Sequence, residues 1–327
     1  MKSVIRMVVV IALVSLFVAT SFTQAAADKM LVYNSGGDFS FYSRGLISDG
    51  SGALMLDAAS QDNLGVWGGA GYDAFMGDID GDHCDEMIVY KQGIGFYARK
   101  LISDGSGGLM LDSSFTNFLG NWGGVGYKGF AGDVDGDSKD EMIVYNTGGD
   151  FSFNSRKVIS NGSGGFMLDA SSQDNLGIWG GTGYDAFMGD LNGDGHDEML
   201  VYNSGSSFTF YSRKLISDGS GGLMLDGSSQ DNLGIWGGTG YKGFMGDING
   251  DNFDEMIVYL PGTGFYARKL ISDGSGGLML DSSSTDFLGN WGGTGYDAFM
   301  GNVVPEPATV SILLLGGAGL FLRRKSS

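Results

Sequence analysis

Residues 78–90 read DIDGDHCDEMIVY, an acidic loop that opens directly into an apolar run. Three further copies begin at Asp133, Asp190 and Asp247, so the first residues of successive copies lie 55, 57 and 57 positions apart. A Leu-Gly-x-Trp-Gly-Gly-x-Gly-Tyr stretch recurs five times and contains Trp67, Trp122, Trp179, Trp236 and Trp291. Residues 28–302 therefore hold five units of about 55 residues, and self-similarity at that period predicts a propeller or a repeat array.

One unit contains four candidate strands and no helical period. In the second unit, the apolar run at 87–90 suits a buried inner strand and residues 96–102 suit a second strand. Residues 109–112 give a third strand, and residues 127–134 give a fourth that enters the next acidic loop. A calcium-binding parallel β-helix would need a period near nine residues. We therefore predict an all-β propeller of five four-stranded blades, with 60 glycines to form its tight turns.

The register of the repeats bears on how the ring closes. Residues 28–33 match residues 197–202, so the mature chain would begin just after an acidic loop. It would end at Asn302, where another loop would start. We predict that the strand at 30–33 lies in or beside the blade completed by residues 296–301. No fifth calcium site is expected there, because Asn302 runs into a different segment.

The first 27 residues resemble a secretory signal peptide. Lys2 and Arg6 form a positive start, residues 8–19 are almost wholly apolar, and residues 25–27 offer a small-residue cleavage site before Asp28. A transmembrane anchor is the alternative, but the apolar stretch is short for a span. We expect a signal helix at 1–27 and export through the Sec route.

Residues 303–327 form a second targeting segment. Pro305, Glu306 and Pro307 precede an apolar run at 308–322, which is followed by a basic cluster. This order resembles the PEP-CTERM sorting signal of Gram-negative bacteria. The resemblance implies a sorting helix, transient anchoring in the inner membrane, and removal of the tail by an exosortase. The product would be released into the extracellular matrix or attached at the outer surface. A plain membrane anchor is the alternative, although the apolar run is short for a span.

Removal of both targeting segments makes the chain more acidic. They contain five of the 19 basic residues and one of the 38 acidic residues, so 14 and 37 remain and the net charge becomes −23. Such a surface repels nucleic acid and anionic lipid. We expect no nucleic-acid partner, and membrane contact only through the uncleaved C-terminal helix. Cys84 is the only cysteine, so no intrachain disulfide can form.

The acidic loops carry the clearest chemistry. Carboxylates or amides at loop positions 1, 3 and 5, with an acid at position 9, can direct hard oxygen ligands at one centre. Without a cation these carboxylates would repel one another, and Ca²⁺ takes six to eight oxygens. Solvated acidic turns without metal are the alternative, because Asp, Asn and Gly favour turns. Turn propensity does not require acids at fixed alternating positions four times, so we predict about four structural Ca²⁺ ions.

These loops, followed by apolar strands, resemble the FG-GAP or VCBS repeats of integrin α-chain and related bacterial propellers. The resemblance covers residues 28–302 and implies oxygen ligands at positions 1, 3, 5 and 9, with a backbone carbonyl at position 7. The implied side-chain ligands are Asp78, Asp80, Asp82 and Glu86; Asp133, Asp135, Asp137 and Glu141; Asp190, Asn192, Asp194 and Glu198; and Asp247, Asn249, Asp251 and Glu255. The implied carbonyls are those of Cys84, Lys139, His196 and Phe253.

Two departures from the family pattern affect these loops. The family usually has Asp at position 9, where this chain has Glu preceded by Asp, and either acid could close the metal shell. Position 6 is often Gly, but only Gly195 keeps it, and the other loops have His83, Ser138 and Asn252. Those three residues are less comfortable at positive φ, so we expect weaker binding there. The expected role of the metal is to fix the loop that joins one blade to the next.

The five Trp residues are candidate ligand contacts, because aromatic rings can stack on sugars and fungal lectins of similar repeat type bind glycans between blades. Filling the space between blades is the alternative, since large aromatic side chains dominate cores. Catalysis has little support. His83 and His196 occupy non-equivalent loop positions without a recurring partner. A glycosidase needs one pair of carboxyls held across a cleft.

The sequence therefore leaves two functions open. The first is an exported, non-catalytic binding protein that recognises polysaccharide at the cell surface or in the matrix. The second is a structural envelope or biofilm protein without a specific ligand. Trp side chains exposed in pockets between blades would favour the first, and fully buried ones the second.

Overall fold

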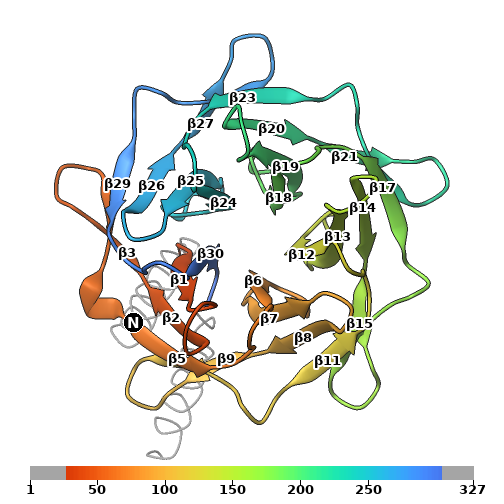
Figure 1. Cartoon of the computed structure of the whole chain (residues 1–327), viewed down its shortest axis with the longest axis horizontal. Coiled ribbons are helices and arrows are strands. Elements are labelled where there is room, and N and C mark those ends of the chain that lie inside the picture. Colours follow the sequence, from red (N-terminus) through yellow and green to blue (C-terminus); the bar gives the residue numbers. More distant parts are fainter. Residues whose placement is uncertain (1–26, 304–327) are drawn as a thin grey trace, which may run out of the picture.

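The computed structural model of the protein describes residues 27–303, which form a ring of five blades around a central axis (Figure 1). Each blade is a four-stranded antiparallel sheet, so the predicted five-bladed, all-β propeller is confirmed. The predicted signal and sorting helices fall on residues outside the described range. Within that range, no helix has the length and apolar character needed to cross a membrane.

The strands of the blades fall into four equivalent sets. Blades 1 to 5 contribute, in that order, the strands given in each set. The innermost strands are β30 (Asp297–Gly301), β6 (Asp73–Gly77), β12 (Tyr127–Gly132), β18 (Tyr184–Gly189) and β24 (Lys242–Gly246). The second strands are β1 (Lys29–Tyr33), β7 (Glu86–Lys91), β13 (Glu141–Asn146), β19 (Glu198–Asn203) and β25 (Glu255–Leu260). The third strands are β2 (Ser40–Arg44), β8 (Gly95–Arg99), β14 (Ser152–Arg156), β20 (Thr209–Arg213) and β26 (Gly264–Arg268). The outer strands are β5 (Asp62–Val66), β11 (Asn117–Gly120), β17 (Asp174–Ile178), β23 (Asp231–Ile235) and β29 (Asp286–Gly289).

The second strand of each blade is the most buried, which explains its unbroken apolar sequence. In β7, Met87, Ile88, Val89 and Tyr90 are all almost fully buried. Successive side chains of a strand point to opposite faces, so such a run requires a neighbour on both faces. Met87 and Val89 pack in the seam with blade 1, and Ile88 and Tyr90 pack in the seam with blade 3. The predicted buried inner strand is therefore confirmed, and it is the second strand from the axis.

A two-stranded hairpin follows the third strand of every blade, and the sequence prediction did not separate it from the blade. The five hairpins pair β3 (Leu46–Ser48) with β4 (Leu54–Leu56), β9 (Leu101–Ser103) with β10 (Leu109–Leu111), β15 (Val158–Ser160) with β16 (Phe166–Leu168), β21 (Leu215–Ser217) with β22 (Leu223–Leu225), and β27 (Leu270–Ser272) with β28 (Leu278–Leu280). Each hairpin lies against the outer strand of the preceding blade, as β16 does against β11. A single-turn 3₁₀ helix, η1 (Ala58–Ser60), follows the first hairpin.

Two predicted strands are therefore wrong in detail. Residues 96–102 do not form one strand, because β8 ends at Arg99 and β9 belongs to the hairpin. Residues 109–112 do not form a blade strand, because β10 pairs only with β9. The outer strand of blade 2 is instead β11, whose register shifts between Phe118 and Gly120. Gly120 has a φ of 141°, a conformation that suits glycine at such an irregularity.

The acidic loops connect the innermost strand to the second strand of the same blade. The first loop, residues 78–85, joins β6 to β7, and these two strands are hydrogen-bonded neighbours. The expectation that the loop joins one blade to the next is wrong. The chain passes between blades through the Gly-rich Trp segment instead, for example from β5 to β6. A rigid loop at this position would fix the hairpin of a single blade.

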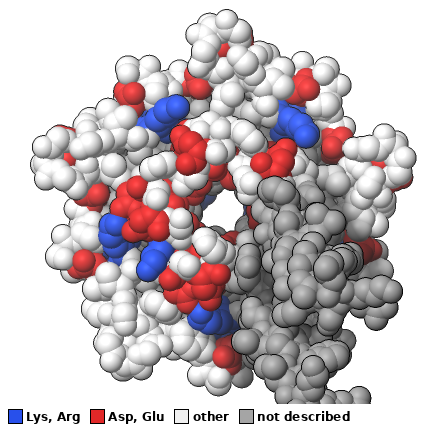
Figure 2. All heavy atoms as spheres, turned by 180° about the vertical axis from the view of Figure 1, so that it is seen from behind, with Lys and Arg blue, Asp and Glu red and all other residues white. Residues whose placement is uncertain are grey.

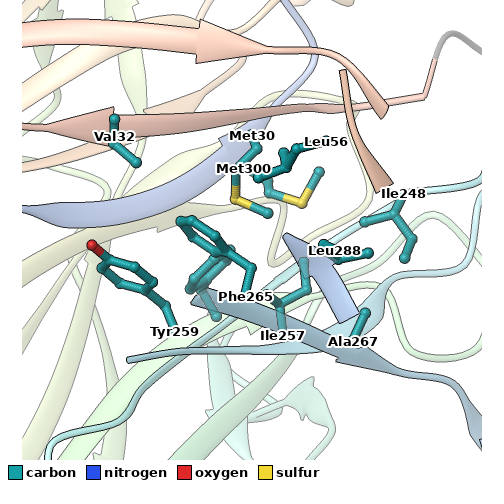
Figure 3. Close-up of a cluster of buried hydrophobic side chains, with 11 residues drawn as sticks. Met30, Val32, Leu56, Ile248, Ile257, Tyr259, Phe265, Ala267, Leu288 and Met300 are labelled. Carbon is teal, nitrogen blue, oxygen red and sulfur yellow. The ribbon is translucent and has the colours of Figure 1, made fainter. Parts of the chain in front are cut away.

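The ring closes through pairing of the first and last strands. β1 pairs with β30 in the register Met30 with Met300 and Val32 with Ala298, and β2 completes the other side. The predicted closure of strand 30–33 with residues 296–301 is confirmed. The core is divided among the five seams between blades. Figure 3 shows the seam between blades 1 and 5, where Met30 and Leu56 meet Ile257 and Phe265.

Candidate functional site

Each acidic loop is wound around the carboxylate of its first residue. Asp78 accepts hydrogen bonds from the backbone N–H groups of Gly81 (2.6 Å) and His83 (2.8 Å). Asp133, Asp190 and Asp247 accept the equivalent bonds in their own loops. A carboxylate oxygen that receives one N–H still has a free lone pair for another partner. Among residues 27–303, Asp133 accepts these two bonds and retains acceptor capacity, whereas Asp247 accepts four N–H bonds.

The sixth residue of every loop has the left-handed backbone conformation expected for this motif. His83, Ser138 and Asn252 have φ values of 63°, 65° and 65°, and Gly195 has a φ of 81°. Only Gly adopts this conformation without a steric cost. All four loops therefore share one backbone shape, although three of them carry a side chain at the strained position. The prediction that those three bind metal more weakly stays a prediction.

The structure separates the two adjacent acids at loop positions 8 and 9. Glu86, at position 9, is almost fully buried, and its Oε2 accepts a hydrogen bond from the N–H of Ile79 (3.2 Å). Carboxylate oxygens of Asp78, Asp80 and Glu86 lie within 4.8 Å of one another. The equivalent oxygens in the blade 3 loop, from Asp133, Asp135 and Glu141, form the same arrangement. In each loop it is the Glu, not the preceding Asp, that faces the loop interior.

These oxygens fit the donor set of a calcium ion. Carboxylates of the first, third and ninth residues converge in the loops of blades 2 and 3, and Ca²⁺ accepts carboxylate, amide and carbonyl oxygens. Burial raises the pKa of Glu86 and Glu141 to about 8, because a charged carboxylate loses hydration there. A divalent cation would reverse that penalty. In blades 4 and 5 the side-chain N–H groups of Asn192 and Asn249 instead donate hydrogen bonds to Glu198 and Glu255.

The Asp at loop position 8 holds two blades together. Asp140 donates its N–H to the carbonyl of Asp78 (2.8 Å), and its Oδ2 accepts the N–H of Asp78 (2.9 Å). The same two-bond pairing occurs at all five seams, between Asp197 and Asp133, Asp254 and Asp190, Asp28 and Asp247, and Asp85 and Asn302. We call these five pairs the Asp clasps. Asp28 and Asn302 complete the ring even where no acidic loop joins the strands.

Substitution of Asp140 tests what the clasp contributes. Asp140→Ala leaves the N–H of Asp78 without its acceptor, which costs about 1–3 kcal/mol of unfolding free energy. Asp140→Asn keeps an acceptor oxygen and removes a charge. Burial, and next the charge of Asp197, raise the pKa of Asp140 well above its usual range. We therefore expect the Asn variant to be at least as stable as the wild type at pH 8 in urea unfolding. A lower free energy of unfolding for the Asn variant than for the Ala variant would contradict this role.

The five Trp residues lie at the seams, half-buried rather than exposed or fully enclosed. Trp122 packs against the core cluster of its seam, and the guanidinium of Arg156 from the next blade lies 4.8 Å from its ring centroid. The same stack occurs at the other four seams, with Arg99 over Trp67, Arg213 over Trp179, Arg268 over Trp236 and Arg44 over Trp291. Each Trp therefore joins two blades. A sugar could stack on the Arg-covered face only after the Arg side chain moved.

Pockets at the seams lie beside the acidic loops, between a hairpin and the preceding blade. The larger one, of about 430 Å³, is lined by apolar Leu46 and Leu54 of blade 1 and by Glu255, Lys269 and Asp286 of blade 5. An equivalent cavity of about 160 Å³ lies one seam away. It is lined by the matching residues Leu278, Glu198, Lys214 and Asp231. Each pocket combines an apolar wall with carboxylate and ammonium groups.

Charge is concentrated around the axis on one face of the ring. Figure 2 shows acidic side chains gathered around a central opening, with basic side chains just outside them. A cavity of about 530 Å³ is lined by the acidic residues Asp28, Asp190, Asp194, Asp247 and Asp254. The loops and the Asp clasps thus contribute to the same strongly negative rim.

Sequence reasoning missed the basic partners of these groups. The Arg residues that stack on Trp and the Lys residues that face the acidic loops stand next to each other, as Arg99 and Lys100 do. A signal for the lysines was present in the sequence. Four units have Lys at this position (Lys100, Lys157, Lys214 and Lys269), and the fifth, which lacks a continuous acidic loop, has Gly45.

Comparison with known proteins supports the targeting segment. Residues 303–325 match the family model of the PEP-CTERM protein-sorting motif. The protein is therefore exported, sorted to the cell envelope or surface, and processed by exosortase-type machinery. Pro305, Glu306 and Pro307 lie in this match, outside the described residues.

The propeller itself has weaker matches. A comparison with curated proteins finds no match. One similar solved structure is described as the basis of specific recognition of non-reducing terminal N-acetylglucosamine by a lectin of Agrocybe aegerita. It shares 17% sequence identity and a TM-score of 0.41, over 84% of this chain and 71% of that chain. We draw no functional conclusion from this similarity. The resemblance to FG-GAP or VCBS repeats stays a prediction.

Proposed function

We propose that this exported propeller is a non-catalytic binding protein for polysaccharide, stabilised by Ca²⁺ in its four acidic loops. The observation that carries the binding proposal is the recurrence of seam pockets with equivalent linings. Concave sites with an apolar wall and a few directed polar groups are the usual binding sites for small ligands. Hydroxyl groups of a sugar can donate to Asp286 and accept from Lys269, while its apolar face covers Leu54.

Repetition suits a polymer better than a single small molecule. Each pocket is modest in size, and a polar ligand bound at one pocket of this kind would bind weakly. A polysaccharide presents the same sugar many times, so several pockets on one ring can engage it together and raise the effective affinity. A cell-surface destination places the protein where such polymers occur. Repetition of one set of side chains around the ring also argues against a unique active site.

A structural envelope role without a specific ligand is the second candidate. The observation that favours it is the Arg side chain over every Trp, which accounts for each Trp as a seam contact. The two candidates differ in whether the seam pockets take up sugar.

A glycan array tests the proposal. We expect the protein in millimolar Ca²⁺ to bind a subset of bacterial polysaccharides, with polymer bound more tightly than the matching monosaccharide. The double variant Asp231→Ala/Asp286→Ala removes one polar wall from both described pockets and should weaken binding. Ser51→Ala, at the exposed tip of a hairpin, serves as the control. Silence across the array with a folded protein would reject the binding role and leave the structural one.

A further inference from the structure

A lysine side chain faces the acidic loop in the blades that have one. The lysine directly follows the third strand, at positions 100, 157, 214 and 269 in blades 2 to 5. Blade 1 has no loop between its innermost and second strands, because these are the two ends of the ring, β30 and β1. At the matching position blade 1 has Gly45, although the flanking residues Arg44 and Leu46 follow the repeat. The lysine thus occurs in the four blades that have an acidic loop and is absent from the blade that lacks one.

The lysine lies among the same oxygens that could ligate a metal. Lys100 Nζ forms ion pairs with Asp80, with Asp82 (3.1 Å) and with the buried Glu86 (3.4 Å). Lys157 Nζ repeats this arrangement in blade 3, with Asp135, with Asp137 (3.1 Å) and with Glu141 (3.7 Å). An ammonium group in contact with three carboxylates neutralises part of their repulsion. It also occupies the space into which the loop directs its side chains.

In blades 4 and 5 a different group contacts the buried Glu of the acidic loop. Their third loop residue is Asn192 or Asn249 instead of Asp, and its amide donates a hydrogen bond to the Glu at position 9. Lys269 lies 3.8 Å from Glu255, its single ion-pair contact, and Lys214 forms no ion pair within 4.0 Å among residues 27–303. The four loops therefore fall into two classes. In blades 2 and 3 the lysine is engaged, and in blades 4 and 5 the Asn amide takes its place.

We infer that Lys100 and Lys157 are exchangeable counter-ions, which hold their loops together without metal and lower the calcium affinity of those loops. The inference rests on the proposed calcium binding. A Ca²⁺ ion among Asp80, Asp82 and Glu86 would stand within a few ångströms of the ammonium group, and like charges at that distance repel. The lysine must swing out for the ion to enter. Each of these two loops thus exchanges one bound cation for another.

This exchange has a consequence for an exported chain. The lysines support a folded ring before it meets calcium, and the ion replaces them where calcium is plentiful. Extracellular calcium modules work at roughly 10⁻⁴–10⁻³ M. A competing ammonium group in two loops moves the affinity of those loops toward the weak end of this range, relative to the loops of blades 4 and 5.

Two matched double variants test the inference. Lys100→Met/Lys157→Met removes the engaged ammonium groups and keeps the aliphatic bulk, and Lys214→Met/Lys269→Met makes the same change where the lysine is not engaged. Calorimetric titration with CaCl₂ and thermal melts in EDTA give two independent readouts. We expect the first variant to bind Ca²⁺ on the order of tenfold more tightly at two sites, and to melt lower than the wild type in EDTA. The second should change both quantities much less. Lys100→Arg/Lys157→Arg, which keeps the charge, should retain wild-type affinity.

The outcomes separate this inference from the proposed function. If the wild type binds Ca²⁺ and both Met variants match it, the lysines are not counter-ions and the calcium proposal stands. If neither the wild type nor any variant binds Ca²⁺, this inference and the proposed calcium binding are both wrong. If Lys100→Met/Lys157→Met does not fold, the single variant Lys157→Met carries the same comparison at one loop. Equal affinity of that single variant and the wild type would overturn the inference.

Discussion

A chain that lacks residues 28–33 is expected not to form a stable ring. These residues include strand β1, in which Met30, Leu31, Val32 and Tyr33 are fully buried. Truncation of one large buried side chain costs about 2–5 kcal/mol. Loss of all four costs about 8–20 kcal/mol, which is as large as the roughly 5–15 kcal/mol that stabilises a typical domain. The deletion also leaves β30 and β2 without their shared neighbour and removes one Asp clasp. Circular dichroism melts should show no cooperative transition.

A circular permutant separates the strand from its position in the chain. Residue 301 is joined to residue 29 through a copy of residues 190–197, and new ends are placed at the exposed hairpin tip between Gly219 and Ser220. The copied loop has the length that joins β18 to β19, so it should connect β30 to β1 in the same way. Exposed loop tips tolerate such openings. We expect a cooperative melt close to that of the original chain. A folded deletion variant, or an unfolded permutant, would show that closure by β1 is not what holds the ring.

The sequence predicted the closure because its repeats are nearly identical, so the fragment at 28–33 could be matched to 197–202. Identity of the repeats did not reveal which strands share a sheet. Leu109–Leu111 looks like any buried strand, and only its pairing with β9 assigns it to a hairpin. The outer strand β11 was not predicted, because Phe118 is half-exposed and Gly120 interrupts the register. Neither feature gives the alternation on which a strand prediction depends.

The candidate site was only partly predictable for a similar reason. Acids at fixed loop positions can be recognised in the sequence, and the structure places Asp78, Asp80 and Glu86 together as expected. The choice between the adjacent acids was not visible, because it depends on the neighbouring blade. Asp140 turns to the backbone of Asp78 in the preceding blade, and that contact spans 62 positions of sequence. Hydrogen-bond partners across a seam depend on how the blades are arranged in the ring, and local sequence does not determine that arrangement.

In EDTA, the melting temperature is expected to fall as the pH rises from 5 to 9. Burial raises the pKa of Glu86 and Glu141 to about 8 and that of Glu255 to about 7, from an ordinary value of 4.5. The folded state then binds these protons more tightly than the unfolded state, so their contribution to stability is complete below pH 4.5. It is lost as the pH passes through the folded pKa values. Each group weakens the metal-free fold by roughly 1.4 kcal/mol per pH unit over that interval.

Calcium should oppose this loss, because it binds the charged carboxylates. At 10 mM Ca²⁺ and a Kd of 10⁻⁴–10⁻³ M, each occupied loop adds about 1.4–2.7 kcal/mol to the stability of the folded state. Four loops together add roughly 6–11 kcal/mol at pH 8, and less at pH 5, where protons compete for the same oxygens. Differential scanning calorimetry at both pH values, in EDTA and in Ca²⁺, measures the effect directly.

The variant Glu86→Gln/Glu141→Gln provides the control, because it removes two titrating carboxylates and keeps their size. In EDTA it should melt higher than the wild type at pH 9 and show a shallower fall with pH, since Gln needs no proton to remain neutral when buried. In Ca²⁺ it should gain less, because two loops have lost a charged oxygen ligand. A higher melting temperature in EDTA together with a smaller gain from Ca²⁺ distinguishes a metal site from an acidic turn. Calcium would leave the stability of an acidic turn unchanged. Wild-type melts that superimpose in EDTA and Ca²⁺ at pH 8 would remove the metal from these loops.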